Sequence, residues 1–153
     1  MQRVVVLGVI LMLLFGNKSS TVLYQSAGST EDWQWTKETS DVTGIVGFTQ
    51  EEWLASIDEL AHGIDENLSE VDFSQEIPIF VTLGWQPTGG YQIIIDQVIQ
   101  DESGLLITVR QQSPGDDDFV IMVMTYPYDF IRVPRQSVKE SFTIIDHDGR
   151  ILD

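Results

Sequence analysis

The residue types that most often carry out chemistry in proteins are scarce in this chain. It has two histidines, His62 and His147, and no cysteine. The lack of cysteine excludes disulfides, thiol catalysis, cysteine-held zinc and iron–sulfur clusters. We place His62 at the end of a predicted helix and His147 in a turn, so neither has the setting of a Ser-His-Asp triad. The pattern indicates a protein that is not an enzyme and uses no cofactor.

Acidic side chains are abundant, with 24 Asp and Glu residues. None stands in an apolar setting that would raise its pKa for glycosidase-like catalysis. The acidic loop that contains Asp65, Glu66, Glu70 and Asp72 lacks the spacing and the mid-loop glycine of an EF-hand. The three adjacent aspartates Asp116–Asp118 cannot all point at one ion. We interpret both clusters as solvated loops, with cation binding as the alternative, and predict no metal site.

The most informative stretch is Ile77–Ile99. Two apolar, β-branched runs flank the short polar interruption Gln86–Gly90, and this spacing predicts two strands joined by a hairpin-like connection. Pro87 fixes its own φ, and the two glycines that end the interruption accept positive φ. Large aromatic residues precede and follow the turn. Two interpretations remain open: a purely structural turn, or a rigid apex that presents its rings to a protein partner.

Four motifs follow one another along the chain: Val71–Ser74, Ile79–Gly84, Pro87–Tyr91 and Tyr126–Tyr128. The same motifs occur in this order in the PrcB family, which this chain therefore resembles. The likeness runs from about Trp53 to about Pro134. The family is known from the C-terminal domain of a subunit of secreted bacterial protease complexes. The resemblance implies an accessory domain that stabilises or positions an extracellular protease and has no chemistry of its own.

The same turn also supports a different hypothesis. Pro87–Tyr91 looks like the Pro-Thr-Thr-Gly-aromatic loop that chagasin-like inhibitors insert into the clefts of cysteine proteases. Gln86 and Gly89 stand where that family favours Asn and Thr, and Tyr126–Tyr128 would have to serve as its second wedge. A chagasin-like peptidase inhibitor is therefore the alternative to the accessory module.

Both hypotheses place the contact with a protein partner, such as a secreted protease, on the same residues. We predict that the partner-binding residues are Trp85, Pro87, Thr88, Gly89, Gly90, Tyr91, Pro127 and Tyr128.

The first residues have the composition of an export signal. Arg3 precedes the apolar run Val4–Phe15, which is shorter than the roughly 20 residues of a membrane span. We predict a signal peptide or uncleaved N-terminal anchor over residues 1–28, a linker over 29–41 and one PrcB-like, β-rich domain over 42–153. The protein is accordingly expected to be secreted or held in the cell envelope.

The charge is strongly acidic, with a formal net charge of −16 at pH 7. No lysine or arginine occurs between Lys37 and Arg110. Such a surface repels the phosphates of nucleic acids and anionic membranes. We therefore predict no nucleic-acid partner, and membrane contact only through an uncleaved leader.

One helix is predicted over about Gln50–His62. Thr49 and Glu52 form a capping box at its start, and Gly63 stands where a C-cap belongs. The apolar residues that fall on its expected buried face are Trp53, Leu54, Ile57, Leu60 and Ala61.

Alternating and continuous apolar runs predict the strands. Leu105–Gln111 alternates, with Leu105, Ile107 and Val109 facing inward. Phe119–Tyr126 is apolar on both faces, which predicts a central strand that is covered on both sides. Further strands are expected over Val42–Phe48, Tyr128–Val133 and Val138–Ile145. The predicted fold class is α+β with mainly antiparallel strands, a sandwich or open barrel with one amphipathic helix packed on it.

Overall fold

The computed structural model describes residues 20–25, 31–32, 41–60, 70–137 and 139–152. Its helix α1 spans Gln50–Leu60. Its strands are β1 (Thr21–Gln25), β2 (Glu31–Asp32), β3 (Thr43–Val46), β4 (Glu76–Thr82), β5 (Gln92–Asp101), β6 (Gly104–Gln112), β7 (Pro127–Pro134) and β8 (Phe142–Ile145).

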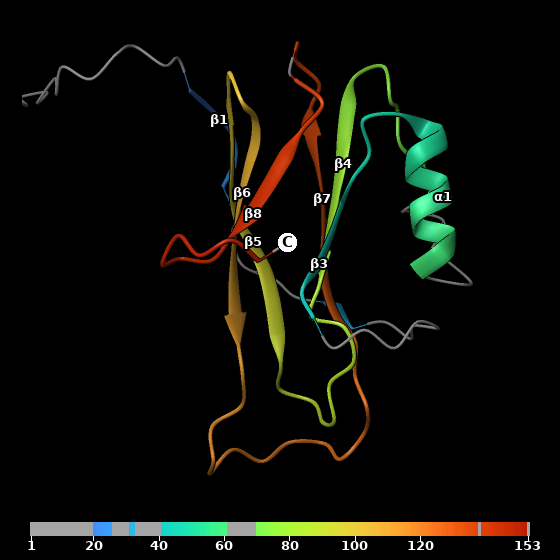
Figure 1. The fold of residues 1–153 in the computed structure, drawn as a ribbon. Helices are drawn as coiled ribbons and strands as arrows, with labels where there is room; N and C mark the ends of the chain where they lie inside the picture. Colours follow the sequence, from blue (N-terminus) through green and yellow to red (C-terminus); the bar gives the residue numbers. More distant parts are fainter. Residues whose placement is uncertain (1–19, 26–30, 33–40, 61–69, 138, 153) are drawn as a thin grey trace, which may run out of the picture.

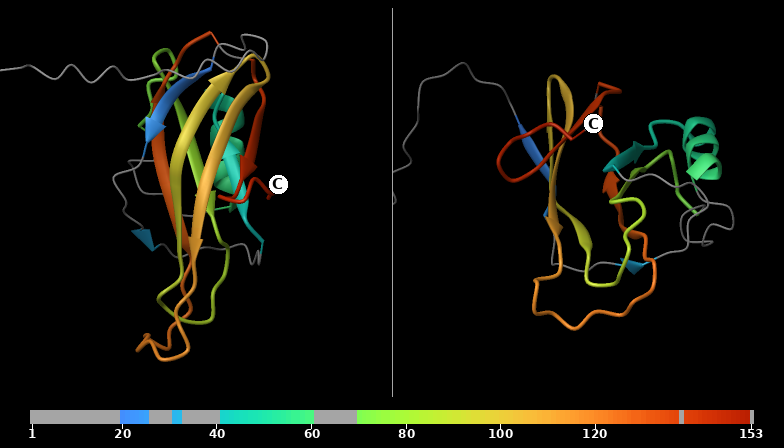
Figure 2. Two further views of the ribbon diagram at one scale, coloured as in Figure 1. Left: turned by 90° about the vertical axis from the view of Figure 1, so that its left-hand side faces the viewer. Right: turned by 60° about the horizontal axis from the view of Figure 1, so that its bottom comes forward.

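The strands form two four-stranded sheets that face each other (Figure 1). The strand order is β1-β5-β6-β8 in one sheet and β2-β7-β4-β3 in the other. The helix α1 covers the outer face of the second sheet, and the loops that follow β4 and β6 project together from one end (Figure 2). The predicted fold class, an α+β sandwich with one packed helix, is confirmed. Strand pairing is antiparallel except between β6 and β8, which are parallel.

The hydrophobic core lies between the two sheets and follows the alternation of their strands. In β6, the predicted inward set of Leu105, Ile107 and Val109 is buried. Burial of each such side chain contributes about 1.5–3 kcal/mol relative to exposure. The other strands supply Ile77, Ile79, Val81, Ile93, Ile95, Val98, Ile131, Val133 and Ile144 to the same layer.

The helix begins as the sequence predicts. The backbone N–H of Glu52 donates to Thr49 Oγ1 at 3.3 Å, which is one of the two bonds of a capping box. Trp53 and Ile57 are buried against the outer face of the second sheet, where they form a separate cluster with Phe80 and Tyr128.

The predicted buried face of the helix is partly wrong, because Leu54 is 40% exposed. Leu54 lies about 100° around the helix from Trp53, which is too far to reach the sheet. Ala61, His62 and Gly63 lie outside the described residues.

A bulge in β5 shapes the first sheet. The register with β6 shifts between Ile95 and Gln97, which leaves Asp96 without a partner residue in the ladder. The Asp96 carboxylate instead contacts Arg110 NH2 at 3.2 Å and His147 Nε2 at 2.5 Å. His147 lies in the turn after β8, as predicted. A second carboxylate, Asp129 of β7, accepts a hydrogen bond from the Ile95 N–H at 2.8 Å and so links the two sheets.

The predicted hairpin over Ile77–Ile99 is wrong. Both apolar runs form strands, but β4 pairs with β3 and β7, whereas β5 pairs with β1 and β6. The connection between them crosses from one sheet to the other. Apolar periodicity shows which face of a strand is buried and not which strand lies beside it, so the turn sequence alone could not distinguish a hairpin from a crossing.

The predicted central strand Phe119–Tyr126 is also wrong. The chain is irregular and mostly exposed from Phe119 to Met124, and β7 begins at Pro127. Coverage on both sides is instead found in β4, and in part of β7, which lie between the opposite sheet and α1. The other predicted strands are present, although β8 is shorter than Val138–Ile145.

The sheets begin earlier in the chain than predicted. β1 pairs with residues 97–100 of β5, and β2 pairs with residues 127–128 of β7. Both strands precede Val42, within the stretches 1–28 and 29–41 that the sequence assigned to a leader and a linker. They are short and lack a clear apolar alternation. The run Val4–Phe15 lies outside the described residues, and no helix in the described part is long and apolar enough to cross a membrane.

The acidic loop before β4 includes a tight turn. Asp72 Oδ1 accepts hydrogen bonds from the Ser74 hydroxyl at 2.6 Å and from the Ser74 N–H at 3.0 Å. Both hydrogen bonds lower the pKa of Asp72 below its ordinary value, and the bond from the hydroxyl has the larger effect. Asp65 and Glu66 lie outside the described residues. Among the residues that are described, no group of three or more His, Cys, Asp or Glu could hold a metal ion.

We expect Trp53→Ala to lower the free energy of unfolding by about 3–5 kcal/mol, because it empties a fully buried aromatic site. Leu54→Ala, one position along the same helix, should cost less than about 1 kcal/mol because Leu54 is exposed. Chemical denaturation of both variants measures the difference. Equal losses would show that α1 does not pack on the sheet through Trp53.

Candidate protein-binding site

We call the connection between β4 and β5, residues 83–91, the crossing. It is held by hydrogen bonds to the segment that precedes β7. Gln86 and Thr125 form an isolated antiparallel bridge, with N–H to carbonyl distances of 2.9 and 3.0 Å. The Gly89 N–H donates to the Ile121 carbonyl oxygen at 3.0 Å. The Thr125 hydroxyl donates to the Thr88 carbonyl oxygen at 2.7 Å. Two loops that are distant in sequence therefore form one unit at the end of the sandwich.

A buried threonine fixes the base of this unit. The Thr82 hydroxyl donates to the Pro127 carbonyl oxygen and accepts from the Gly84 N–H, both at 2.9 Å. The Leu83 N–H reaches the same Pro127 carbonyl at 3.1 Å. Because Thr82 is almost completely buried, its hydroxyl satisfies backbone groups that water cannot reach. The crossing therefore leaves the sheet in a defined direction.

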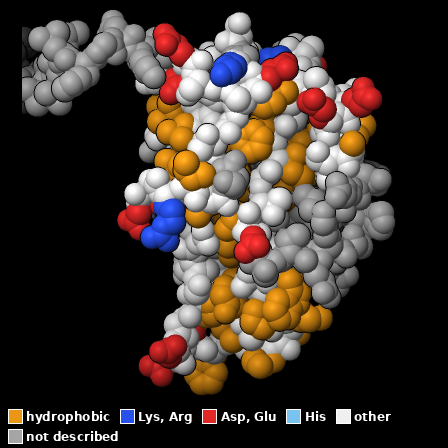
Figure 3. All heavy atoms as spheres, in the orientation of Figure 1, with side chains coloured by type: hydrophobic (Ala, Val, Ile, Leu, Met, Phe, Trp, Pro, Cys, Tyr) orange, Lys and Arg blue, Asp and Glu red, His pale blue; other side chains and the backbone are white. Residues whose placement is uncertain are grey.

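The outer surface of this unit is apolar. We use the name apical segment for Phe119–Met124, six consecutive apolar residues of which Phe119 is fully exposed and Met122 is 82% exposed. Ile121, Val123 and Met124 are each exposed by more than half, and Trp85 of the crossing is also exposed. Figure 3 shows hydrophobic side chains gathered at the end where these loops lie. Contiguous exposed apolar surface is a common feature of interaction sites.

Acidic residues flank the apical segment on its N-terminal side. Asp116 and Asp117 are exposed, and Asp118 Oδ2 accepts a hydrogen bond from the Gly115 N–H at 2.7 Å. The Asp118 carboxylate is thus used to close its own turn. This arrangement fits the predicted solvated loop and gives the apolar surface a negative border.

The structure separates the predicted site residues into three groups. Trp85, Pro87 and Gly90 are exposed, and Thr88 and Tyr91 are partly buried. Gly89 is buried beneath Ile121, where a Cβ atom on Gly89 would lie 2.7 Å from Ile121 Cγ1. The apex of the predicted turn is therefore covered by the apical segment.

Pro127 and Tyr128 are corrections to the predicted surface. Both are buried, and Tyr128, which is 4% exposed, stacks on Phe80 with ring centroids 5.4 Å apart. Tyr128 faces α1 because it occupies an outward position of β7, on the side that the helix covers. These two residues support the fold and do not offer a contact to a partner.

These positions argue against the inhibitor hypothesis. A wedge must enter a cleft with its apex first, but Gly89 lies beneath Ile121. The second wedge would need Pro127 and Tyr128 at the surface, where they are not found.

The most exposed residues of the site were missed by the sequence analysis. Phe119–Met124 carries the pattern of a core strand, and its exposure cannot be read from that pattern. One signal was present. Three aspartates precede the run directly, and natural sequences place charges beside exposed strand-forming segments to limit aggregation.

A comparison with family models bears on this region. Residues 77–134 match the family model described as PrcB C-terminal. The resemblance to the PrcB family is confirmed. The match runs from β4 to β7, so it contains the crossing, the apical segment and Thr82. No curated protein and no solved structure matches the chain.

We expect Gly90→Ala to destabilise the site through the backbone. Gly90 has φ of +88°, and an added Cβ would lie 2.9 Å from Val120 and 3.0 Å from Pro114. The free energy of unfolding should fall by about 1–2 kcal/mol. Gly115→Ala is the control in the neighbouring loop, because its Cβ meets only the flexible Asp118 side chain. A thermal unfolding experiment that finds the two variants equal would contradict the described packing.

Proposed function

We propose that this protein is an exported, non-enzymatic binding module that associates with an extracellular protease complex through its apical segment. The observation that carries the proposal is the exposure of Phe119–Met124 within the PrcB-matching region. The PrcB family supports a protease complex as the setting and export as the destination. The role we infer is to stabilise or position the protease.

Hydrogen bonding supports a role in recognition. The Gly89 N–H bonds the Ile121 carbonyl oxygen within the apical segment. Gln86 and Thr88 bond Thr125, the residue that follows the segment, so the segment is tied to the crossing before a partner arrives. A preorganised surface loses less conformational entropy on binding than a flexible one. Its large aromatic and methionine side chains are types that are enriched at protein interfaces.

Charge favours a protein over a lipid surface or nucleic acid as the partner. Asp116–Asp118 lie directly beside the apolar residues, and the chain carries a net charge of −16. Phosphate groups of anionic lipids or nucleic acids would be repelled from this end. A protein with an apolar depression bordered by lysine or arginine would match both features of the surface.

The polar groups at the site support a non-enzymatic role. The Thr125 hydroxyl donates to the Thr88 carbonyl oxygen, and the Thr88 hydroxyl donates to the Gly89 carbonyl oxygen at 3.1 Å. Each hydroxyl thus serves the loop structure. A nucleophilic threonine would instead need a general base within hydrogen-bond reach. We propose no cofactor.

The test is affinity capture from the native culture fluid with the full-length protein, followed by identification of the captured chains. We expect a secreted protease or its complex. Phe119→Asp and Met122→Asp, made singly, should each weaken its binding at least about tenfold, because a charge would be buried at the centre of the interface.

The control is Ile151→Asp. Ile151 is 63% exposed, close to the 66% of Ile121, but lies beyond β8 near the C-terminus. It should retain wild-type affinity, and all three variants should keep the wild-type melting temperature. Capture of no protease, or equal binding by Met122→Asp and Ile151→Asp, would refute the proposed function.

A further inference from the structure

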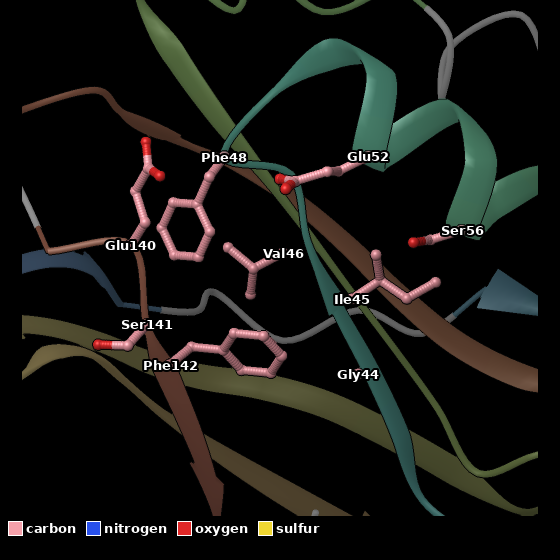
Figure 4. Close-up of a pocket in the computed structure, with 9 residues that line it drawn as sticks. All are labelled: Gly44, Ile45, Val46, Phe48, Glu52, Ser56, Glu140, Ser141 and Phe142. Atoms are coloured by element: carbon pink, nitrogen blue, oxygen red, sulfur yellow. The ribbon is translucent and has the colours of Figure 1, made fainter.

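A second surface lies apart from the apical segment, on the side of the sandwich where β3 forms the edge of its sheet. β3 pairs with β4 alone among the described strands. An open groove of about 590 Å³ runs along it. Its lining comes from β3, from the first turns of α1 and from the segment that leads into β8 (Figure 4). All of these residues lie outside the PrcB match.

The outer edge of β3 offers backbone hydrogen-bonding groups. The Gly47 N–H donates to the Pro78 carbonyl oxygen of β4 at 2.9 Å. In an antiparallel pair, alternate residues direct both backbone groups to the same side. Thr43 and Ile45 therefore face β4, and the N–H and carbonyl groups of Gly44 and Val46 face away from it, toward the groove.

The edge strand of the facing sheet, β8, differs from β3. In β8, the Leu152 N–H donates to the Ile144 carbonyl oxygen at 3.0 Å, and Ile145 forms a bridge with Ile151. The chain therefore folds its own last residues over the edge of β8. Among the described residues, no such segment covers β3.

The wall of the groove opposite β3 is firmly held. Ser141 accepts a hydrogen bond from the Leu105 N–H at 2.9 Å, and its hydroxyl donates to the Ser103 carbonyl oxygen at 2.5 Å. These bonds join the segment before β8 to the β5–β6 turn. The groove thus has two fixed walls, which favours recognition of an extended ligand without large rearrangement.

The side chains in the groove define the chemistry of the ligand. Figure 4 shows Val46, Phe48 and Phe142 grouped in the groove, with Glu140 and Glu52 on its opposite walls. Those two carboxylates are exposed, and no lysine or arginine is among the nine lining residues. Arg135 donates from NH2 to the carbonyl oxygen of the lining residue Phe48 at 2.5 Å, so one cation lies beside the groove. The groove therefore combines an open strand edge, an apolar floor of which Phe142 is the partly exposed residue, and two carboxylates on its rim.

We propose that this groove binds an extended basic peptide segment of a partner protein, which adds to β3 as a further strand. Backbone groups of the peptide pair with Gly44 and Val46. Its apolar side chains face the partly exposed Phe142, beneath which Val46 and Phe48 are buried. Lysine or arginine at the alternate positions lies beside Glu52 on the helix wall, while Glu140 on the other wall adds to the negative potential. Strand addition of this kind obtains affinity from the backbone and selectivity from alternate side chains. The proposal does not depend on the proposed function of the apical segment.

The test uses a short synthetic peptide of alternating lysine and valine with blocked ends, added to the full-length protein. Backbone amide NMR should show shifts at Gly44 and Val46, and both amides should become protected from hydrogen exchange. N-methylation of the peptide at one alternating set of residues should abolish binding, and N-methylation of the other set should not. If neither set matters, strand addition is wrong.

Two variant pairs separate the groove from general attraction to an acidic protein. Glu52→Gln with Glu140→Gln should weaken binding about tenfold, in line with the loss of two partly screened charge pairs. Asp116→Asn with Asp117→Asn makes the same change in net charge at the apical end and should leave the affinity within about twofold. Equal weakening by both pairs would overturn the proposal. So would protection of the Gly44 and Val46 amides without peptide, because a segment of the chain itself would then cover the edge.

Discussion

The arrangement of the whole domain depends on how the chain passes from β4 to β5. β4 ends at Thr82 in one sheet, and β5 begins at Gln92 in the facing sheet. Residues 83–91 must therefore cross the end of the core without leaving buried backbone groups unpaired. Thr82 and Thr125 satisfy those groups through their hydroxyls, and the Pro127 carbonyl accepts two of the bonds. A further bond, from the Gly89 N–H to the Ile121 carbonyl oxygen, joins the crossing to Phe119–Met124. The position of this exposed apolar surface therefore depends on the crossing.

The domain presents two surfaces of different character. The apical segment is convex, apolar and built within the PrcB-matching region. The groove beside β3 is concave, bordered by carboxylates and built from elements on either side of that region. The two lie on different parts of the sandwich and use no residue in common. If both proposed contacts form with one partner, the second contact becomes intramolecular and raises the overall affinity.

Local sequence rules predicted which segments form the helix and the strands better than they predicted which strands lie side by side. The capping box at Thr49, the inward set in β6 and the strand β7 follow from spacing within a few residues. The crossing, the outward position of Tyr128 and the pairing of β1 with β5 depend on contacts between distant residues, which spacing does not encode. Phe119–Met124 shows the same limit most clearly. Its pattern is that of a strand covered on both faces, and the described part of this chain does not cover it.

The strand order also determines when the fold can form. β1 finds its partner in residues 97–100 and β2 in residues 127–128, while the first sheet is completed only by β8. Contacts between residues so far apart in sequence require long loops to close, and the entropy cost of that closure comes before the contacts stabilise the fold. A chain that emerges N-terminus first therefore holds β1 unpaired until residue 100 has appeared and β2 unpaired until residue 128 has appeared. The first sheet cannot be complete before β8 has emerged as well.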